Sequence, residues 1–220
     1  MAEKGTTVAG DLYESITAKI FEIGRQLRQK NGYPFNPHQL NLHLQNAIEG
    51  KFSTDIDPRF EFLGESSLTV PEGHKPKEQL KIFKEKYGKN FSYYNDDITD
   101  QNFPNPTHEL IPGKTYKVKK FGIKKGKSIS SEDGLALLKS QNAYLVGAQG
   151  ASVVYQLKRD ELPKGKFYIS FDEKDALLAD TGGRHRVPRV RHNGDGDFGF
   201  DLGYFGLDCH EDFVVLCLCD

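Results

Sequence analysis

The chain has almost no excess of charge of either sign. Its 220 residues carry 30 Lys and Arg against 31 Asp and Glu, which gives a formal net charge of −1 at pH 7. A nearly neutral chain has no overall electric field that would attract nucleic acid or an anionic membrane surface. Partners of that kind would have to recognise a local patch.

The chain also lacks a long apolar run. The longest strongly apolar stretch, Phe213 to Cys219, falls far short of the ~20 residues that a membrane-spanning helix needs. The first ten residues, MAEKGTTVAG, lack the basic region and apolar stretch of a secretory signal. The sequence therefore predicts a cytoplasmic protein with no membrane partner.

Cysteine is scarce, and its three copies are crowded together. Cys209, Cys217 and Cys219 all lie in the last twelve residues, which argues against a disulfide framework. Thiolate and imidazole are zinc ligands, but the spacing of these cysteines and His210 does not match a zinc knuckle. We interpret the cysteines as small apolar residues of a buried final strand, and we expect neither a metal site nor a cofactor.

Helical patterns fill the N-terminal part of the chain. Apolar residues recur at helical spacing from Leu12 to Leu27, which predicts a helix from about Asp11 to Gln29. A second helix is predicted between the N-cap Asn36 and Gly50. The stretch KPKEQLKIFKEKYG predicts a third helix that ends at Gly88.

The residue pattern changes from helical to strand-like after an irregular segment, 95–112, which is rich in acids, amides and prolines. One further helix is predicted from about Ser131 to Ser140, with Ser130 and Asp133 spaced as an acidic capping box. Short strands dominate the rest, and they are predicted at Lys114 to Ile123, Tyr144 to Val146, Ser152 to Leu157, Lys166 to Phe171, Val187 to His192, Asp197 to Leu202 and Phe213 to Cys219.

Helices followed by strands predict an α+β protein, with a helical N-terminal part and then a mostly antiparallel sheet that carries one inserted helix. The predicted organisation is a helical region 1–94, a connecting segment 95–112 and a β-rich region 113–220. One compact domain overall is the alternative. The sequence leaves open whether the N-terminal helices pack on the sheet.

The stretch from Arg184 to Asp201 reads as a charged β-hairpin. A two-residue turn would set Arg189 against Phe200, whereas a loop of odd length sets Val190 against an aromatic residue and an arginine against an aspartate. We therefore predict an odd-length loop. Pro188 cannot donate to a strand ladder, so its strand is expected at a sheet edge or with a bulge.

Three interpretations of this hairpin stay open. In the first, its charges form a solvated cross-strand ladder without catalysis. In the second, Asn193, Asp195 and Asp197 begin a calcium loop, although the later positions of the EF-hand pattern are missing. In the third, guanidinium groups beside the Gly182-Gly183 turn bind a carboxylate or phosphate. The anion-binding candidates are Arg184, His185 and Arg186.

A lysine-rich segment between Lys114 and Lys127 contains no acid and is interleaved with Tyr116 and Phe121. A basic strand with aromatic residues can hold a nucleic-acid backbone and stack on bases. The alternative is that the aromatic residues fill the core while the lysines are solvated. The nucleic-acid-binding candidates are Lys117, Lys119, Lys120, Lys124 and Lys125.

No motif for catalysis is intact. GIKKGKS, Gly122 to Ser128, has one residue too few between its glycines for a phosphate-binding loop. In HELIP, Pro112 stands where a zinc metalloprotease has its second histidine. GAQGAS, Gly147 to Ser152, is predicted to precede a strand and therefore fits neither a nucleophile elbow nor a dinucleotide-binding turn.

The segments LQNAIEGKF, YLVGAQGASVVYQL, LPKGKFYISFDEKDALL and DFVVLCLCD resemble an uncharacterised family of small prokaryotic proteins. The resemblance implies an intracellular, bacterial origin and supplies no reaction or ligand. The leading hypothesis is a non-enzymatic cytoplasmic protein that contacts another macromolecule. The alternatives are a nucleic-acid-binding protein that uses Lys114 to Lys127 and the Arg184 to Arg191 strand, and a hydrolase with a pocket near Asp172, Arg184 and His185.

Overall fold

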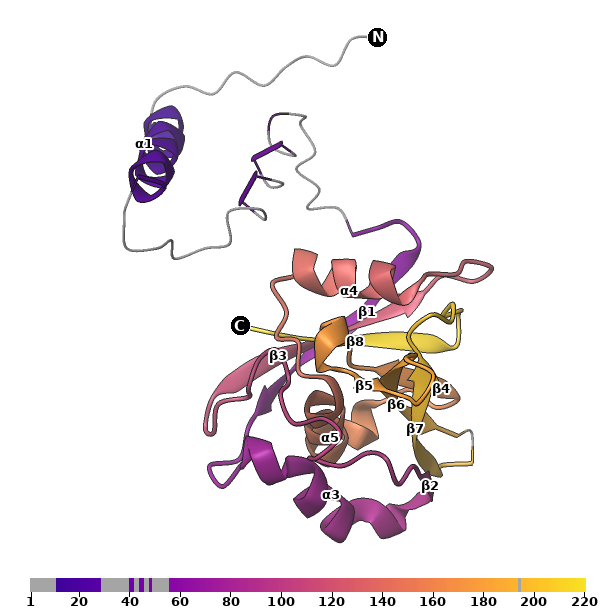
Figure 1. Cartoon of the computed structure of the whole chain (residues 1–220). Helices are drawn as coiled ribbons and strands as arrows, with labels where there is room; N and C mark the ends of the chain where they lie inside the picture. Colours follow the sequence, from indigo (N-terminus) through magenta and orange to yellow (C-terminus); the bar gives the residue numbers. More distant parts are fainter. Residues whose placement is uncertain (1–10, 29–39, 42–43, 46–47, 49–55, 194) are drawn as a thin grey trace. The chain divides into compact units, whose positions relative to one another are not determined.

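The computed structural model describes residues 11–28, 40–41, 44–45, 48, 56–193 and 195–220 (Figure 1). The chain divides into two units, Met1–Ser53 and Thr54–Asp220. In the first unit, helix α1 spans Asp11–Gln26, as predicted, and exposes Ile16, Ile20 and Phe21. The second predicted helix, Asn36 to Gly50, lies largely outside the described residues.

The second unit is built on a mixed, eight-stranded sheet in the order β1-β3-β8-β4-β6-β7-β2, with the short β5 paired to β6. Neighbouring strands are antiparallel except in the pairs β4 with β8 and β2 with β7. The strands are β1 Phe60–Thr69, β2 Phe91–Tyr94, β3 Thr115–Ile123, β4 Lys166–Ile169, β5 Leu178–Ala179, β6 His185–His192, β7 Phe198–Tyr204 and β8 Phe213–Cys219.

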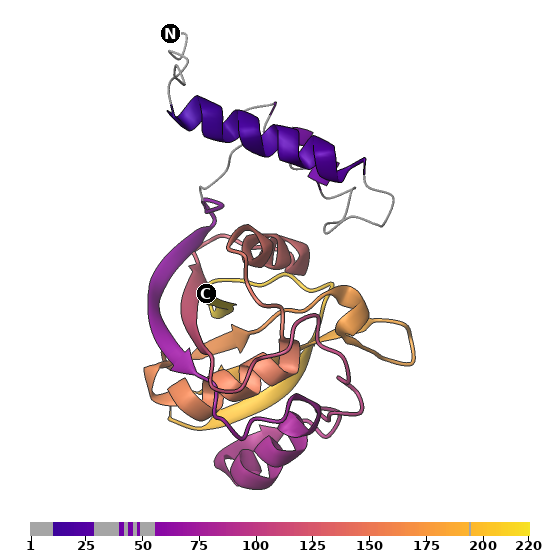
Figure 2. The ribbon, with the colours of Figure 1, turned by 90° about the vertical axis from the view of Figure 1, so that its left-hand side faces the viewer.

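Helices cover both faces of this sheet. Helix α4, Ser131–Ser140, lies on one side, and α5, Gly147–Lys158, lies on the other with α3, Gln79–Tyr87 (Figure 2). Short 3-10 turns occur at Pro76–Glu78, Gly88–Asn90, Arg159–Glu161 and Lys174–Ala176. Two hydrophobic cores result, one between the sheet, α3 and α5, and one between the sheet and α4. The predicted α+β class, with a mostly antiparallel sheet, is confirmed.

Side-chain caps hold the first turns of two of these helices. At α4, Ser130 Oγ accepts from Asp133 N, and Asp133 Oδ2 accepts from Ser130 N, which is the predicted capping box. Helix α3 has no side-chain cap from the residue that precedes it. Asp100 supplies that cap from outside the helix, because its two carboxylate oxygens accept from Leu80 N and Lys81 N, each at 2.9 Å.

The predicted strand at Ser152 to Leu157 is wrong, because these residues form the C-terminal half of α5. Residues 147–155 of this helix are all buried. A helix that is buried on every side shows no amphipathic period, so its β-branched residues resemble a buried strand. GAQGAS is therefore the start of a helix, with Gly147 at φ +45°. The predicted strand Tyr144 to Val146 is reduced to a single bridge between Tyr144 and Leu218.

The charged hairpin has the predicted odd loop. Five residues, 193–197, connect β6 to β7, and Val190 stands opposite Phe200 while Arg189 stands opposite Asp201. The prediction for Pro188 is wrong, because β6 is an interior strand. The ladder to β4 stops at Arg189 and the ladder to β5 begins at Arg186. Pro188 therefore lies in a gap between these two partners, where its missing N–H interrupts no ladder.

The two regions predicted on either side of segment 95–112 share one sheet. Strands β1 and β2 come before this segment, and they pair with β3 and β7, which come after it. The segment itself contains no helix or strand. It crosses the unit as an irregular connection that passes beside α3.

Candidate functional site

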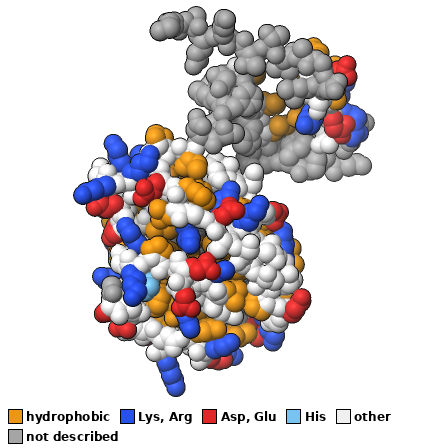
Figure 3. Space-filling model, turned by 180° about the vertical axis from the view of Figure 1, so that it is seen from behind, with side chains coloured by type: hydrophobic (Ala, Val, Ile, Leu, Met, Phe, Trp, Pro, Cys, Tyr) orange, Lys and Arg blue, Asp and Glu red, His pale blue; other side chains and the backbone are white. Residues whose placement is uncertain are grey.

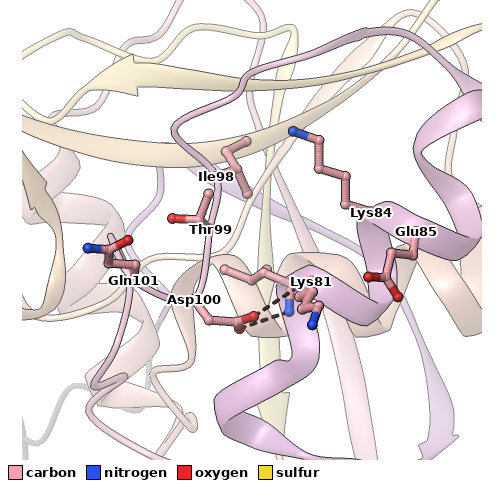
Figure 4. A pocket seen from close by; sticks show the side chains of 8 residues that line it. Lys81, Lys84, Glu85, Ile98, Thr99, Asp100 and Gln101 are labelled. Carbon is pink, nitrogen blue, oxygen red and sulfur yellow. Dashed lines mark hydrogen bonds between the residues drawn. The ribbon is translucent and has the colours of Figure 1, made fainter.

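A groove lies between α3 and residues 98–101 (Figure 4). Its volume is about 560 Å³. This is within the range of small-ligand pockets, and the groove is open to solvent. It is lined by Leu80, Lys81, Lys84, Glu85, Ile98, Thr99, Asp100 and Gln101. We refer to it below as the α3 groove.

The floor of the α3 groove is apolar. Leu80 and Ile98 line it, and both are continuous with the core between the sheet, α3 and α5. Their exposed fractions are 0% and 1%, so the groove reaches the surface of a packed core rather than a loose loop. Because both side chains are already buried, an apolar group in the groove would mainly cover the apolar surface around them.

Asp100 holds the wall of the α3 groove in place. Its carboxylate bridges the N–H groups of Leu80 and Lys81 (Figure 4), which ties segment 98–101 to the first turn of α3. The positive end of the helix dipole favours this negative charge. Asp100 is therefore engaged in a structural role.

The rim of the α3 groove carries charges of both signs. Lys84 is paired with Asp96 at 2.8 Å, and this hydrogen bond lowers the pKa of Asp96. Lys84 also lies over the ring of Tyr94, with its Nζ 5.1 Å from the ring centroid. The exposed Lys81 and Glu85 lie one helical turn apart on α3, and no ion pair joins either to another described residue. These two charges are available to a ligand.

The side chains that line the α3 groove do not place a nucleophile beside a free base. Nucleophilic or acid-base catalysis needs a nucleophile or a base placed beside its partner, with a pKa adapted to the task. Among the lining residues, Asp100 is bound to two backbone N–H groups and Lys84 is bound to Asp96. The remaining polar groups of the lining are the hydroxyl of Thr99, the amide of Gln101 and two exposed charges.

Two of the three anion-binding candidates, Arg184 and Arg186, contact the carboxylate of Asp180. Arg184 Nε and Arg186 Nη2 each lie 3.1 Å from Asp180 Oδ2, and both guanidinium groups lie over the ring of Tyr204. Asp180 Oδ1 also accepts the N–H of Arg184, and this bond contributes most to the lowered pKa of Asp180. His185 Nδ1 is buried and has no hydrogen-bond partner among the described residues. An intramolecular carboxylate thus occupies the predicted anion position.

The residues of the hydrolase hypothesis have separate partners. Asp172 is 2% exposed, and its Oδ1 accepts from Thr107 N at 3.1 Å and from Glu173 N at 2.8 Å. Burial raises the pKa of Asp172 to about 6. No hydrogen bond or ion pair in the described part of the chain joins Asp172 to Arg184 or His185.

The nucleic-acid candidates lie on an interior strand and on the turn that follows it. Lys117 and Lys119 project from one face of β3 and Lys120 projects from the other, because neighbouring residues of a strand alternate. Lys119 donates to Gln141 Oε1 and Lys120 donates to the carbonyl of Glu161. Lys124 and Lys125 are exposed after the strand. On the face in Figure 3, basic and acidic side chains are interspersed.

The candidate metal ligands do not gather. Cys209, Cys217 and Cys219 are free and at most 5% exposed, which confirms their interpretation as core residues. Burial raises the thiol pKa of Cys209 to about 11 and that of Cys217 to about 12. In the hairpin loop, Asp195 accepts the N–H of Asp197. The described residues contain no group of three or more potential ligands.

A second, smaller pocket of about 50 Å³ lies on the α4 side of the sheet and includes Arg189, Ser131 and Cys209. Arg189 Nη2 donates to Asp201 at 2.8 Å, whereas Arg189 Nε is buried without a hydrogen-bond partner. Asp208 also lines this pocket. Together with Asp201, it leaves no net positive charge that would favour an anion.

The sequence gives no signal for the α3 groove. It places Leu80 only within the third predicted helix and residues 98–101 only within the irregular segment 95–112. Their proximity depends on the bond from Asp100 to the start of α3, across about twenty residues of sequence. A carboxylate in an irregular segment carries no sequence signal for the helix that it caps.

Comparisons of the chain with models of known families, with curated proteins and with solved structures find no match. In the part of the chain that the structure describes, no helix has the length and apolar character needed to cross a membrane.

Proposed function

We propose that this chain is a non-enzymatic interaction protein that binds an amphipathic segment of a partner protein in the α3 groove. The observation that carries the proposal is the groove itself, with its apolar floor of Leu80 and Ile98 beneath two unpaired rim charges. A pocket that buries an apolar anchor within a polar rim is the usual arrangement of an interaction hot spot.

The rim charges define the segment that fits. An acidic side chain of the partner would pair with Lys81, and a basic side chain would pair with Glu85. Because the two rim residues are one helical turn apart, the complementary charges must flank the apolar anchor at a similar spacing. Such charges contribute more to the choice and orientation of the partner than to raw affinity.

Selection of peptides tests this proposal. Random twelve-residue peptides displayed on phage are selected on the full-length protein, and the dissociation constant of each enriched peptide is measured by fluorescence anisotropy. We expect the enriched peptides to combine a large apolar residue with an acid and a base. The substitutions Lys81→Glu and Glu85→Lys should each weaken binding about fivefold, as expected for an exposed charge pair.

The matched control is Lys125→Glu, which changes the same charge at an exposed site after β3. Its affinity for the selected peptides should equal that of the wild type. A peptide with its acid replaced by lysine should regain affinity for the Lys81→Glu variant. Peptides that bind the wild type and both rim variants equally well would refute the α3 groove as the binding site.

A further inference from the structure

Strand β1 is an edge strand of the sheet, and its outer side has no strand partner among the described residues. The exposed edge is visible in Figure 2, where β1 forms the outer border of the sheet. A row of unpaired backbone groups on such an edge is a template for another strand. The outer edge of β1 is therefore a candidate interaction surface, separate from the α3 groove.

The backbone groups that face outward can be identified from the ladder to β3. Val70 N donates to Lys114 O and Val70 O accepts from Gly113 N, each at 2.9 Å, so Val70 faces inward. The direction alternates along a strand. Ser66 and Leu68 thus face β3, and the N–H and C=O groups of Glu65, Ser67 and Thr69 face the open edge. The side chains of these three residues are exposed.

A β-bulge limits the usable edge to this run. The register with β3 shifts between Phe62 and Gly64, and Gly64 has φ +125°. Before the bulge, Phe60 N already donates to Asp57 O. The straight, unpaired part of the edge therefore extends from Glu65 to Thr69, with Ser67 at its centre.

We propose that this edge pairs with the same edge of a second copy of the chain, antiparallel and with Ser67 on the twofold axis. In this register Glu65 stands opposite Thr69 of the second copy, and Ser67 stands opposite Ser67 of the second copy. All three outward-facing residues of each copy then exchange backbone hydrogen bonds. The Thr69 hydroxyl forms a hydrogen bond with Thr115 Oγ1 at 2.9 Å, and in this register it also lies beside a carboxylate that can accept from it.

Charge repulsion favours a twofold axis at Ser67 over an axis at Glu65. A twofold axis at Glu65 would place two carboxylates directly opposite each other, which is destabilising. With the axis at Ser67, the two Glu65 side chains are separated by roughly 14 Å from the strand rise and strand spacing. That distance exceeds the Debye length of about 8 Å at physiological ionic strength. Axes at Ser66 or Leu68 leave one outward-facing residue of each copy unpaired.

The test is sedimentation equilibrium of the full-length protein over a range of concentrations. We expect a reversible monomer-dimer equilibrium for the wild type. Ser67→Pro removes an N–H that faces the open edge and not one of the ladder. It should raise the dimer dissociation constant at least tenfold and leave the thermal unfolding of the monomer, measured at low protein concentration, unchanged. Ser67→Lys places two like charges at the axis without a backbone change and should have the same effect.

Two controls separate the edge from other surfaces. Gln101→Lys adds the same charge in the α3 groove and should dimerise like the wild type. Under mild oxidation, Ser67→Cys should form a disulfide-linked dimer faster than Ser66→Cys, because only position 67 lies on the axis. A wild type that stays monomeric at the highest concentration, or a Ser67→Lys variant that dimerises like the wild type, would overturn the proposal.

Discussion

Replacing Gly134 by alanine is expected to lower the free energy of unfolding by about 1 to 3 kcal/mol, the usual cost of overpacking a core. Gly134 lies in α4 where the helix meets the sheet. A Cβ atom there would stand 2.5 Å from Cε2 of the Phe171 ring and 3.0 Å from its Cζ. Phe171 is fully buried, so the added methyl group would press on a ring of the core. Denaturant unfolding of the two proteins measures the difference.

The matched control for this substitution is Gly88→Ala. Gly88 has helical backbone angles, φ −54° and ψ −33°, and an added Cβ would make only an ordinary contact of 3.5 Å with Lys84. This control should be neutral or stabilising, because alanine restricts the unfolded chain. In the double variant Gly134→Ala with Phe171→Leu, the smaller side chain should recover part of the loss. Equal stabilities of Gly134→Ala and the wild type would show that α4 does not pack on Phe171.

Asp172→Asn is expected to raise the free energy of unfolding at pH 7.5 by up to about 3 kcal/mol. The Asp172 carboxyl is buried, and burial raises its pKa from 3.8 to about 6. Each pKa unit corresponds to roughly 1.4 kcal/mol. An asparagine carries no charge to bury, and its Oδ1 can still accept from Thr107 N and Glu173 N. Chemical unfolding at several pH values measures the effect.

The raised pKa of Asp172 determines how the stability of the protein changes with pH. The folded protein keeps the proton on Asp172 up to about pH 6, whereas the unfolded chain releases it near pH 3.8. The stability contributed by this group is therefore complete below about pH 4 and is lost as the pH rises through 6. Asp172→Asn should remove this component. Asp180→Asn is the opposite control, because the pKa of Asp180 is lowered and its loss should destabilise the protein at neutral pH.

Local signals in the sequence were sufficient for several elements. The capping pair Ser130 and Asp133 placed the start of α4, and the apolar run placed β8 at Phe213–Cys219. The hairpin loop followed from pairing like faces, because an error of one residue would have set Arg189 against Phe200. In each case the deciding interaction is between residues that are close in sequence or belong to one strand.

The missed elements depend on distant partners. Strand β1 contains Gly64 and two serines and is polar at many exposed positions, so its apolar alternation is weak. Strand β2 pairs in parallel with β7, more than a hundred residues away. Helix α5 was mistaken for a strand because tertiary burial on all sides removed the helical period. Sequence spacing alone contains none of this information.

The candidate sites in the structure differ from those predicted from the sequence, again because they depend on residues that are distant in sequence. The clusters of charge in the sequence predicted binding sites at Arg184, Arg186 and the lysines of β3. In the fold, most of these side chains have partners within the chain, which are Asp180, Gln141 and Glu161. The rim charges of the α3 groove, Lys81 and Glu85, are unremarkable in the sequence. They become a candidate site only because segment 98–101 is held beside α3.

Methyl NMR of the full-length protein shows whether the α3 groove binds an apolar anchor of a partner. A selected peptide is titrated into protein with labelled isoleucine and leucine methyl groups. We predict saturable shifts of the Ile98 and Leu80 methyl signals, with intermolecular NOEs from both to the apolar side chain of the peptide. Saturable binding that leaves these two signals unchanged and perturbs methyl groups elsewhere would contradict the account.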